Sequence, residues 1–315
     1  MIKFDNFCDN RKGISFSTYS GASFNVIGKI KDPYTDLCLW KTRMEISPGV
    51  SYFFRCDYLK IKNLRFEIFD TSDGSLLLKV DSETNERYQI EEFDRFGKLK
   101  SFFYPDKEVD SSAGIPLISI FIDKEYEMPN CKVEEGEVVF DIGSNLGFFS
   151  YYSLCRGASK IYCFEPGAPQ CSSIRENFGS FENLIIEESA VSDTDGELDF
   201  YYDPESSWVS TLTPQKNFRS MPSKSINLNT YIKDKNIQKI DFLKIDCEGE
   251  EYKIIESLDD NFLSNNVKKI CLEYHNNSGK NLYDLVQKLY RCKFIVDLLD
   301  KDIHDTQQGM LYAWK

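Results

Sequence analysis

The sequence predicts an α/β protein: a doubly wound, largely parallel sheet that ends in an antiparallel hairpin, preceded by a small all-β sandwich. Strand and helix patterns alternate from residue 137 onward, no helix pattern separates the last two strands, and short strands alternate with turns between residues 15 and 104. Repeated strand–helix units favour a parallel sheet with helices on both faces. Two strands joined without a crossover helix pair antiparallel.

The first part of the chain reads as strands separated by turn residues. We expect strands at 37–46, 51–58, 64–70 and 76–81, and a further hairpin through 89–93 and 99–103. Apolar and polar residues alternate within these segments, and Ser47-Pro-Gly and Ser72-Asp-Gly mark turns. The pattern predicts a β-sandwich domain over residues 1–105. Its turns and aromatic residues suit a carbohydrate-binding module, and an oligomerisation or anchoring module would show the same pattern.

The second predicted domain covers residues 106–315, with its core at 136–315. Expected strands lie at 138–142, 160–165, 184–189, 240–245, 269–274, 294–299 and 310–314, and expected helices at 146–156, 170–178, 250–258 and 282–289. Strands buried on both faces read as continuous apolar runs, as most of these do. A doubly wound sheet that ends in a hairpin is the arrangement of class I methyltransferases rather than of nucleotide-dependent dehydrogenases.

Charge and cysteine content narrow the class of partner. With 38 Lys and Arg against 51 Asp and Glu, the net charge of −13 disfavours a nucleic-acid substrate. The ten cysteines form no C-x-x-C pair, and residues 1–8 contain no apolar signal-peptide region. The longest apolar stretch, 113–122, is shorter than the ~20 residues of a membrane helix. We therefore expect a cytoplasmic protein with reduced cysteines and no membrane span.

Residues with binding chemistry follow the first two strands of the second domain. Gly143 and Gly147 allow the backbone to approach a ligand closely, and Glu165 can accept hydrogen bonds from a ribose diol. Asp141 would repel a pyrophosphate, which favours a cofactor with a cationic group such as S-adenosylmethionine. The alternative is a simple tight turn beside a solvated strand end.

Five motifs resemble the FkbM family of S-adenosylmethionine-dependent O-methyltransferases. They occur in the family's order: Val139-Phe-Asp-Ile-Gly-Ser-Asn-Leu-Gly-Phe-Phe-Ser, Cys163-Phe-Glu-Pro, Ala190-Val-Ser-Asp-Thr-Asp-Gly, Phe242-Leu-Lys-Ile-Asp-Cys-Glu-Gly-Glu-Glu and Leu272-Glu-Tyr-His. The resemblance covers roughly residues 110–315 and leaves 1–105 without a counterpart. Ser144 stands where many members carry Ala, and Cys247 stands where many carry Val.

The resemblance implies roles for the matching residues, all of which follow strand ends. Those implied to line the cofactor are Asp141, Gly143, Asn145 and Gly147 at its methionine end, Glu165 at the ribose, Ser189, Ala190 and Val191 at the adenine, and Asp246 near the methyl group. Those implied to face the acceptor are Asp246, Glu248, Gly249, Glu273 and His275.

Methyl transfer to a hydroxyl is assisted when the hydroxyl loses its proton. His275 is the first candidate base, because its ordinary pKa is near neutral, and Asp246 is the second. Asp246 and Glu248 are also candidate ligands for a divalent cation such as Mg²⁺. A structural role for His275, or a helix-capping role for Glu248, would account for the same residues.

The acceptor is the least specified part of the prediction. Residues 203–223 are irregular, and we expect a loop or lid over the pocket, with Trp208 as a stacking surface for the acceptor. The family includes enzymes that modify saccharides and polyketides, so the expected partner is a sugar, a glycan or another hydroxyl-bearing molecule. A non-catalytic sugar-binding protein is the alternative. An NAD-dependent enzyme would need a G-x-G-x-x-G turn, which the chain lacks.

Overall fold

The computed structural model describes residues 2–8, 13–18, 24–31, 38–47, 51–55, 64–82, 119–121, 124–203, 206–211, 218–275, 281–302 and 305–315. By its internal contacts the chain divides into two compact units, Met1–Phe102 with Asp106–Asp123, and Phe103–Pro105 with Lys124–Lys315. The boundary expected after residue 105 stays a prediction. The hairpin expected at 89–93 and 99–103 lies outside the described residues.

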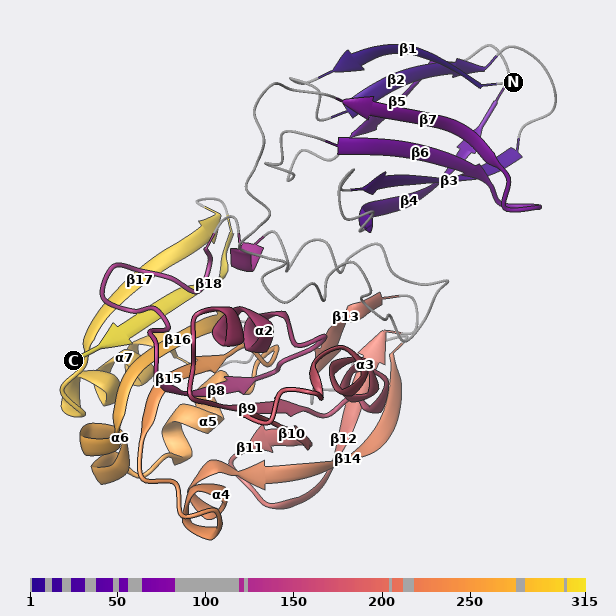
Figure 1. The fold of residues 1–315 in the computed structure, drawn as a ribbon. Helices are drawn as coiled ribbons and strands as arrows, with labels where there is room; N and C mark the ends of the chain where they lie inside the picture. Colours follow the sequence, from indigo (N-terminus) through magenta and orange to yellow (C-terminus); the bar gives the residue numbers. More distant parts are fainter. Residues whose placement is uncertain are drawn as a thin grey trace. The chain divides into compact units, whose positions relative to one another are not determined.

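The first unit consists of antiparallel strands in two sheets, ordered β1-β2-β5 and β4-β3-β6-β7 (Figure 1). The strands are β1 (Ile2–Cys8), β2 (Gly13–Thr18), β3 (Phe24–Lys31), β4 (Cys38–Ile46), β5 (Ser51–Arg55), β6 (Leu64–Asp70) and β7 (Leu76–Ser82). Alternate residues are fully buried, Ile14 and Phe16 on β2 and Val26 and Ile30 on β3. This alternation agrees with the predicted all-β domain. Its carbohydrate-binding role stays a prediction.

The second unit contains a seven-stranded sheet in the order β10-β9-β8-β15-β16-β18-β17. Its strands are β8 (Val138–Ile142), β9 (Lys160–Glu165), β10 (Leu184–Glu188), β15 (Ile240–Ile245), β16 (Val267–His275), β17 (Ile295–Asp302) and β18 (Asp305–Trp314). The first five pair in parallel, and β18 pairs antiparallel with both β16 and β17. This order confirms the predicted class I methyltransferase sheet with its C-terminal hairpin.

Six described helices accompany the sheet: α2 (Phe148–Cys155), α3 (Ala168–Phe178), α4 (Leu228–Asp234), α5 (Glu251–Ser257), α6 (Asp260–Asn266) and α7 (Leu282–Arg291). The central strands β8 and β15 are buried along almost their whole length, which places Phe140 and Leu243 in one continuous core with Ile254 of α5. A rigid centre of this kind fixes the positions of the residues at the strand ends. None of the described helices has the length and apolar character to cross a membrane.

The stretch expected as an irregular lid is largely regular. A second sheet of four strands, ordered β11-β14-β12-β13, is formed by β11 (Ala190–Ser192), β12 (Gly196–Asp203), β13 (Ser206–Thr211) and β14 (Arg219–Asn227). The expectation of an irregular segment over residues 203–223 is therefore wrong for 206–211 and from 219 onward. The polar residues of β13 and β14 resemble loop sequence, so the sequence did not predict strands there. Both segments are strands because they pair with β12.

Candidate active site

The site lies where the parallel strands end. In a doubly wound sheet, ligands bind beyond the carboxyl ends of the strands. The chain continues from β8 into Gly143 and Asn145, from β9 into Pro166, from β10 into Ser189 and from β15 into Asp246, while β16 ends at His275. The structure thus brings together at one edge the residues that the sequence predicted at the ends of five strands.

The turn after β8 depends on a glycine at position 143. Gly143 has φ +72°, and a Cβ there would lie 1.8 Å from the backbone oxygen of Asp246. The amide of Asp246 donates to the carbonyl of Ile142 over 3.1 Å, so the turns after β8 and β15 touch. Any larger residue at 143 would push these two turns apart.

Glu165, at the end of β9, is held by the two neighbouring turns. Its Oε2 accepts the amide of Asn145 and its Oε1 accepts the amide of Gly167, each over 2.8 Å. Burial raises the pKa of Glu165 to about 7, although these amides favour the charged form. A carboxylate fixed by two amides keeps lone pairs available for further donors, as a ribose diol requires.

Two buried polar atoms near this carboxylate have no hydrogen-bond partner in the structure. They are the side-chain oxygen Oδ1 of Asn145 and the hydroxyl Oγ of Ser189. Buried polar atoms usually have partners, so a bound group that supplied hydrogen bonds here would fit these two atoms. Ala190 and Val191, which follow Ser189, are buried.

Asp141 lies beneath the turn. Its side chain has no exposed surface, its Oδ2 accepts the hydroxyl of Ser150 over 2.7 Å, and its Oδ1 lies 3.3 Å from the ammonium of Lys244. This arrangement supports the turn from within the protein. A direct contact between the Asp141 carboxylate and a cofactor stays a prediction, and the burial of this side chain does not favour it.

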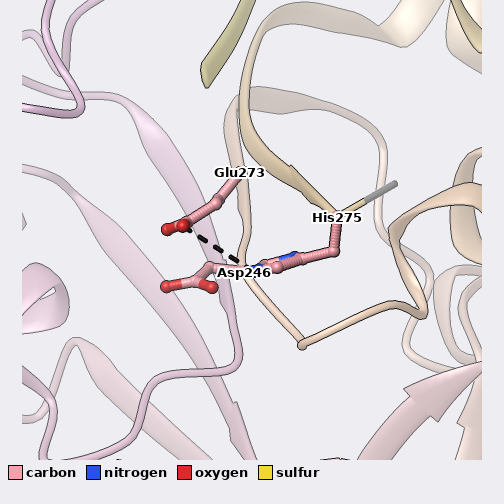
Figure 2. A group of neighbouring side chains, drawn as sticks. All are labelled: Asp246, Glu273 and His275. Atoms are coloured by element: carbon pink, nitrogen blue, oxygen red, sulfur yellow. Dashed lines mark ion pairs between the residues drawn. The ribbon is translucent and has the colours of Figure 1, made fainter. Parts of the chain in front are cut away.

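Asp246, Glu273 and His275 meet at the ends of β15 and β16 (Figure 2). One donor atom from each lies within 4.8 Å of the others. The Nε2 atom of His275 is 3.7 Å from Glu273 Oε1 and 3.5 Å from Glu248 Oε2. Glu273 and His275 are buried, whereas the side chain of Asp246 is 26% exposed. Asp246 is therefore the member of this group that a ligand reaches most easily.

A second carboxylate holds the other nitrogen of His275. Its Nδ1 atom lies 3.1 Å from Oε1 of Glu251, a fully buried residue at the start of α5. Burial alone would lower the pKa of His275, but Glu251, Glu248 and Asp246 raise it to about 9. His275 is therefore protonated at neutral pH when nothing else is bound, which weakens its candidacy as a base acting directly.

Glu251 also closes the turn that precedes α5. Its carboxylate accepts the amides of Cys247 and Gly249, at 3.0 Å for the shortest contact to each. Both amides precede α5, whose N-cap residue Glu250 makes no side-chain cap hydrogen bond, and the capping role considered for Glu248 stays a prediction. Burial and the like charge of Asp246 raise the pKa of Glu248 to about 7. The sequence motif contained Glu251, but an acid at a helix start is so common that it carried no distinct signal.

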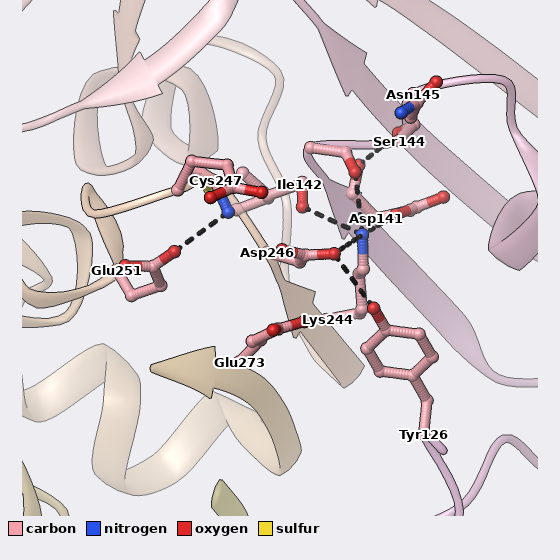
Figure 3. A network of polar contacts seen from close by, with 12 residues as sticks. Tyr126, Asp141, Ile142, Ser144, Asn145, Lys244, Asp246, Cys247, Glu251 and Glu273 are labelled. Carbon is pink, nitrogen blue, oxygen red and sulfur yellow. Dashed lines mark hydrogen bonds and ion pairs between the residues drawn. The ribbon is translucent and has the colours of Figure 1, made fainter. Parts of the chain in front are cut away.

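Lys244 is a functional residue that the sequence reasoning missed (Figure 3). Its side chain is buried, and its ammonium lies 2.7 Å from the carbonyl of Gly143 and 3.8 Å from Oδ2 of Asp246, in addition to its contact with Asp141. Burial alone would lower the pKa of Lys244, but Asp141 and Asp246 raise it above its ordinary value. A lysine inside an apolar strand was the available signal, because such a residue needs buried partners.

Tyr126 is a second missed residue. Its hydroxyl donates to Oδ2 of Asp246 over 2.9 Å, and its ring centroid lies 5.4 Å from the ammonium of Lys244. Tyr126 lies in the segment before β8, far from Asp246 in sequence, so no local pattern could reveal the contact. Together with Lys244 it fixes one oxygen of the Asp246 carboxylate.

The acceptor role expected for Trp208 and the cation role expected for Glu248 stay predictions. Trp208 lies on β13, whose side chains are outside the described part of the structure, so its stacking role stays a prediction. Glu248 was expected to hold a cation with Asp246. The group of potential metal donors found among the described residues pairs Asp246 with Glu273 and His275 instead.

The sheet order and the strand-end residues define a class I, S-adenosylmethionine-dependent methyltransferase. The particular family follows from a family model, described as the methyltransferase FkbM domain, which matches residues 141–296. This part of the chain belongs to the FkbM family, in agreement with the motifs in the sequence.

The similar proteins with described activities share little sequence identity with this chain or match only a short part of it. The hexuronic acid methyltransferase AglP of Haloferax volcanii is 22% identical over 168 residues, covering 53% of this chain and 67% of AglP. The 31-O-demethyl-FK506 methyltransferase FkbM of Streptomyces tacrolimicus is 22% identical over 194 residues, covering 51% of this chain and 74% of that protein. The 2-O-methyltransferase NoeI of Sinorhizobium fredii is 35% identical over 65 residues, which are 20% of this chain and 27% of NoeI.

Among solved structures, the precorrin-6y C5,15-methyltransferase of Geobacter metallireducens aligns with 68% of this chain and 95% of its own. The TM-score is 0.37 and the identity is 14%. The fold assignment above rests on the strand order of the chain itself.

Proposed function

We propose that this protein transfers a methyl group from S-adenosylmethionine to a hydroxyl group, with a sugar or glycan as the acceptor. The observation that carries the proposal is the contact between the turns after β8 and β15. That contact brings the cofactor-side residues next to Asp246, which lies within reach of Glu273 and His275. A donor and an acceptor bound on the two sides of this contact would be held close enough to react.

The residues on the cofactor side fit S-adenosylmethionine. When bound, S-adenosylmethionine supplies a methyl group on a positively charged sulfur, which an acceptor oxygen displaces. Glu165 would accept the ribose hydroxyls, since two amides already orient its carboxylate. The unpaired oxygens of Asn145 and Ser189 would gain partners on the cofactor. Gly143 lets the turns after β8 and β15 stay in contact, which keeps this side next to Asp246.

Methylation of a hydroxyl releases one proton, and the acceptor side must help it to leave. We assign this activation to Asp246 as the group that acts directly on the hydroxyl, supported by His275 beside it. The exposed part of the Asp246 carboxylate reaches the acceptor, whereas His275 is oriented by Glu251. Assistance of this kind is worth roughly 10²- to 10⁴-fold in rate. Loss of either residue should therefore lower turnover far more than cofactor affinity.

The choice of a sugar acceptor rests on two supports. AglP is named as a hexuronic acid methyltransferase and NoeI as a 2-O-methyltransferase, and both match this domain. The excess of acidic residues also disfavours acceptors with phosphate backbones. A hexuronic acid or a hexose glycoside is the first acceptor to test.

The test uses the full chain with methyl-labelled S-adenosylmethionine and a panel of hexuronic acids, hexosides and oligosaccharides. Calorimetry measures cofactor binding separately from transfer. We expect wild type to bind the cofactor and to label at least one sugar, with the modified position assigned by NMR. Absence of cofactor binding, or equal binding by Glu165→Ala and wild type, would overturn the cofactor assignment.

Two variants separate the acceptor side from the cofactor side. His275→Ala and Asp246→Ala should keep cofactor affinity within a few-fold while losing most turnover. Glu134→Ala is a matched control, because Glu134 is 62% exposed and precedes β8, at the opposite ends of the parallel strands. Full turnover in both His275→Ala and Asp246→Ala would refute the assigned roles even if the enzyme methylates sugars.

A further inference from the structure

We propose that Asp246, Glu273 and His275 form a divalent-cation site, and that the cation binds two adjacent oxygens of the acceptor. The inference rests on the proposed function, because it names how the same site holds and activates a hydroxyl. It replaces the pair Asp246 and Glu248 expected from the sequence with a set drawn from two neighbouring strands.

The donor set has the composition and spacing of a cation site. Two carboxylates and one imidazole offer donor atoms that all lie within 4.8 Å of one another (Figure 2). Ligands at right angles around a cation with bonds near 2.1 Å lie about 3 Å apart, and opposite ligands about 4 Å apart. Small side-chain rotations would therefore close the set around an ion. Asp246 directly follows β15, and the other two residues lie on β16, so the backbone holds them rigidly.

An independent observation concerns His275. Its Nδ1 faces the buried carboxylate of Glu251, while its Nε2 points toward Glu273 and Glu248. Histidine ligands of metals almost always give their second nitrogen to a carboxylate or carbonyl in this way, which fixes the ring and its tautomer. Glu251 is itself fixed by the amides of Cys247 and Gly249. The support for a metal-bound Nε2 is thus already in place.

Asp246 has the same kind of outer support. The hydroxyl of Tyr126 and the ammonium of Lys244 both approach its Oδ2, at 2.9 and 3.8 Å. These contacts orient the carboxylate from the side of the protein core. Outer partners that orient each ligand distinguish a built cation site from a chance group of acids.

The local charge also favours a cation. Four carboxylates lie close to His275, those of Asp246, Glu248, Glu251 and Glu273. Lys244 supplies one positive charge beside Asp246. Partly buried like charges repel one another strongly, since the local dielectric is low. A divalent cation bound among these carboxylates would lower this repulsion.

Such an ion explains how a weakly acidic sugar hydroxyl is activated. A six-coordinate ion with three protein ligands keeps positions for two adjacent acceptor oxygens. Coordination would withdraw electron density from the hydroxyl, so its proton would pass more readily to water at the exposed side of Asp246, while the oxygen takes the methyl group and S-adenosylhomocysteine leaves. The acceptor class is therefore a sugar with neighbouring oxygens, such as a 1,2-diol or a hydroxyl beside a carboxylate.

The experiment measures Mn²⁺ binding by electron paramagnetic resonance, in which the signal of free Mn²⁺ disappears when the ion binds. The full chain is first treated with EDTA and dialysed. We expect one tight site in wild type and at least a tenfold weaker one in Glu273→Gln. Glu248→Gln should weaken Mn²⁺ binding less than Glu273→Gln does, because it removes a nearby charge but no ligand, and the exposed Glu134→Gln is the matched control that should bind as wild type does. Calorimetric binding of S-adenosylmethionine checks that each variant is folded.

The outcomes separate this inference from the proposed function. Failure of wild type to bind Mn²⁺, or equal binding by Glu273→Gln and wild type, would overturn the cation site. Full methyl transfer after EDTA treatment would overturn the cation's role and leave the methyltransferase assignment intact, with His275 or Asp246 acting directly. Tight Mn²⁺ binding without transfer to any sugar would instead refute the proposed acceptor.

Discussion

Replacing the buried Lys244 by Met should destabilise the second unit by more than any exposed charge replacement. Met keeps most of the side-chain length and volume but removes the ammonium. Three oxygen atoms at the end of β8 and in the turn that follows would lose their contact with the ammonium. They are Asp141 Oδ1 at 3.3 Å, the Gly143 carbonyl at 2.7 Å and the Ile142 carbonyl at 3.4 Å. Asp141 would keep only the hydroxyl of Ser150.

The magnitude follows from the burial of both partners. Lys244 is 3% exposed and Asp141 is 0% exposed, so solvent screens their interaction little. Removing one partner of a buried ion pair leaves an uncompensated charge and costs about 3 to 5 kcal/mol. Neutralising the stranded charge should recover part of that cost. We therefore expect the double variant Lys244→Met with Asp141→Asn to be more stable than Lys244→Met alone by about 1 to 3 kcal/mol.

The assay is urea unfolding of the full chain with a reporter confined to the second unit. The chain has three tryptophans, and replacing Trp40 and Trp208 by Phe leaves Trp314 on β18. Wild type, both single variants and the double variant are compared in this background. An unchanged m-value would show that the variants differ in stability and not in the extent of unfolding.

One result would refute the reasoning. If Lys244→Met costs less than about 1 kcal/mol, the ion pair with Asp141 does not hold the turn. The same conclusion would follow if Asp141→Asn added its own cost to that of Lys244→Met without any recovery, because independent residues are additive.

The next prediction concerns the turn after β8. Gly143→Ala puts a Cβ 1.8 Å from the Asp246 carbonyl oxygen, so Tm and calorimetric cofactor binding should both fall. Gly136→Ala, at φ +80° with nothing within 4 Å, should cost only about 1 to 2 kcal/mol of backbone strain, and equal losses in Tm would contradict the clash. Glu165 has a folded-state pKa of about 7 against an ordinary 4.5, so wild type loses stability as pH rises through this range. In urea unfolding, Glu165→Gln should therefore gain about 2 to 3 kcal/mol relative to wild type between pH 5 and pH 8, whereas a constant difference would count against the raised pKa. Tyr126→Phe removes the 2.9 Å hydrogen bond to Asp246 and should weaken Mn²⁺ binding about tenfold with little change in Tm; unchanged affinity would show that Tyr126 does not orient Asp246.

The sheet and the position of the site could be predicted from the sequence because both depend on local patterns. The runs at 138–142, 160–165 and 240–245 are apolar enough to be buried on both faces, and the structure has strands with these same bounds. Parallel strands end at one edge, so residues that follow them had to meet there. Glu165 and His275 could be placed at one rim without any knowledge of their contacts.

The side-chain contacts within the site depend on how distant segments of the chain fold together, so the sequence could not predict them. Tyr126 reaches Asp246 from a segment before the first strand of the sheet, and no spacing rule connects the two. Lys244 inside an apolar strand indicates a residue that needs buried partners, but the strand pattern cannot say which residues those partners are. The strands of the small sheet, β12 and β13, were hidden because polar residues such as Ser206 and Ser207 resemble loop sequence.

The charge distribution explains why the missed lysine matters to the predicted function. Carboxylates lie on both sides of the contact between the two turns: Asp141 on the proposed cofactor side and Asp246 on the proposed acceptor side. A cationic cofactor and a divalent ion both favour such a site, but in their absence the carboxylates would repel one another. Lys244 lies between Asp141 and Asp246 and donates to the Gly143 carbonyl, so it holds the acidic turns in place before any ligand arrives. In a preformed acidic site of this kind the oriented groups need not rearrange on binding, so less of the binding free energy is lost to assembling the site.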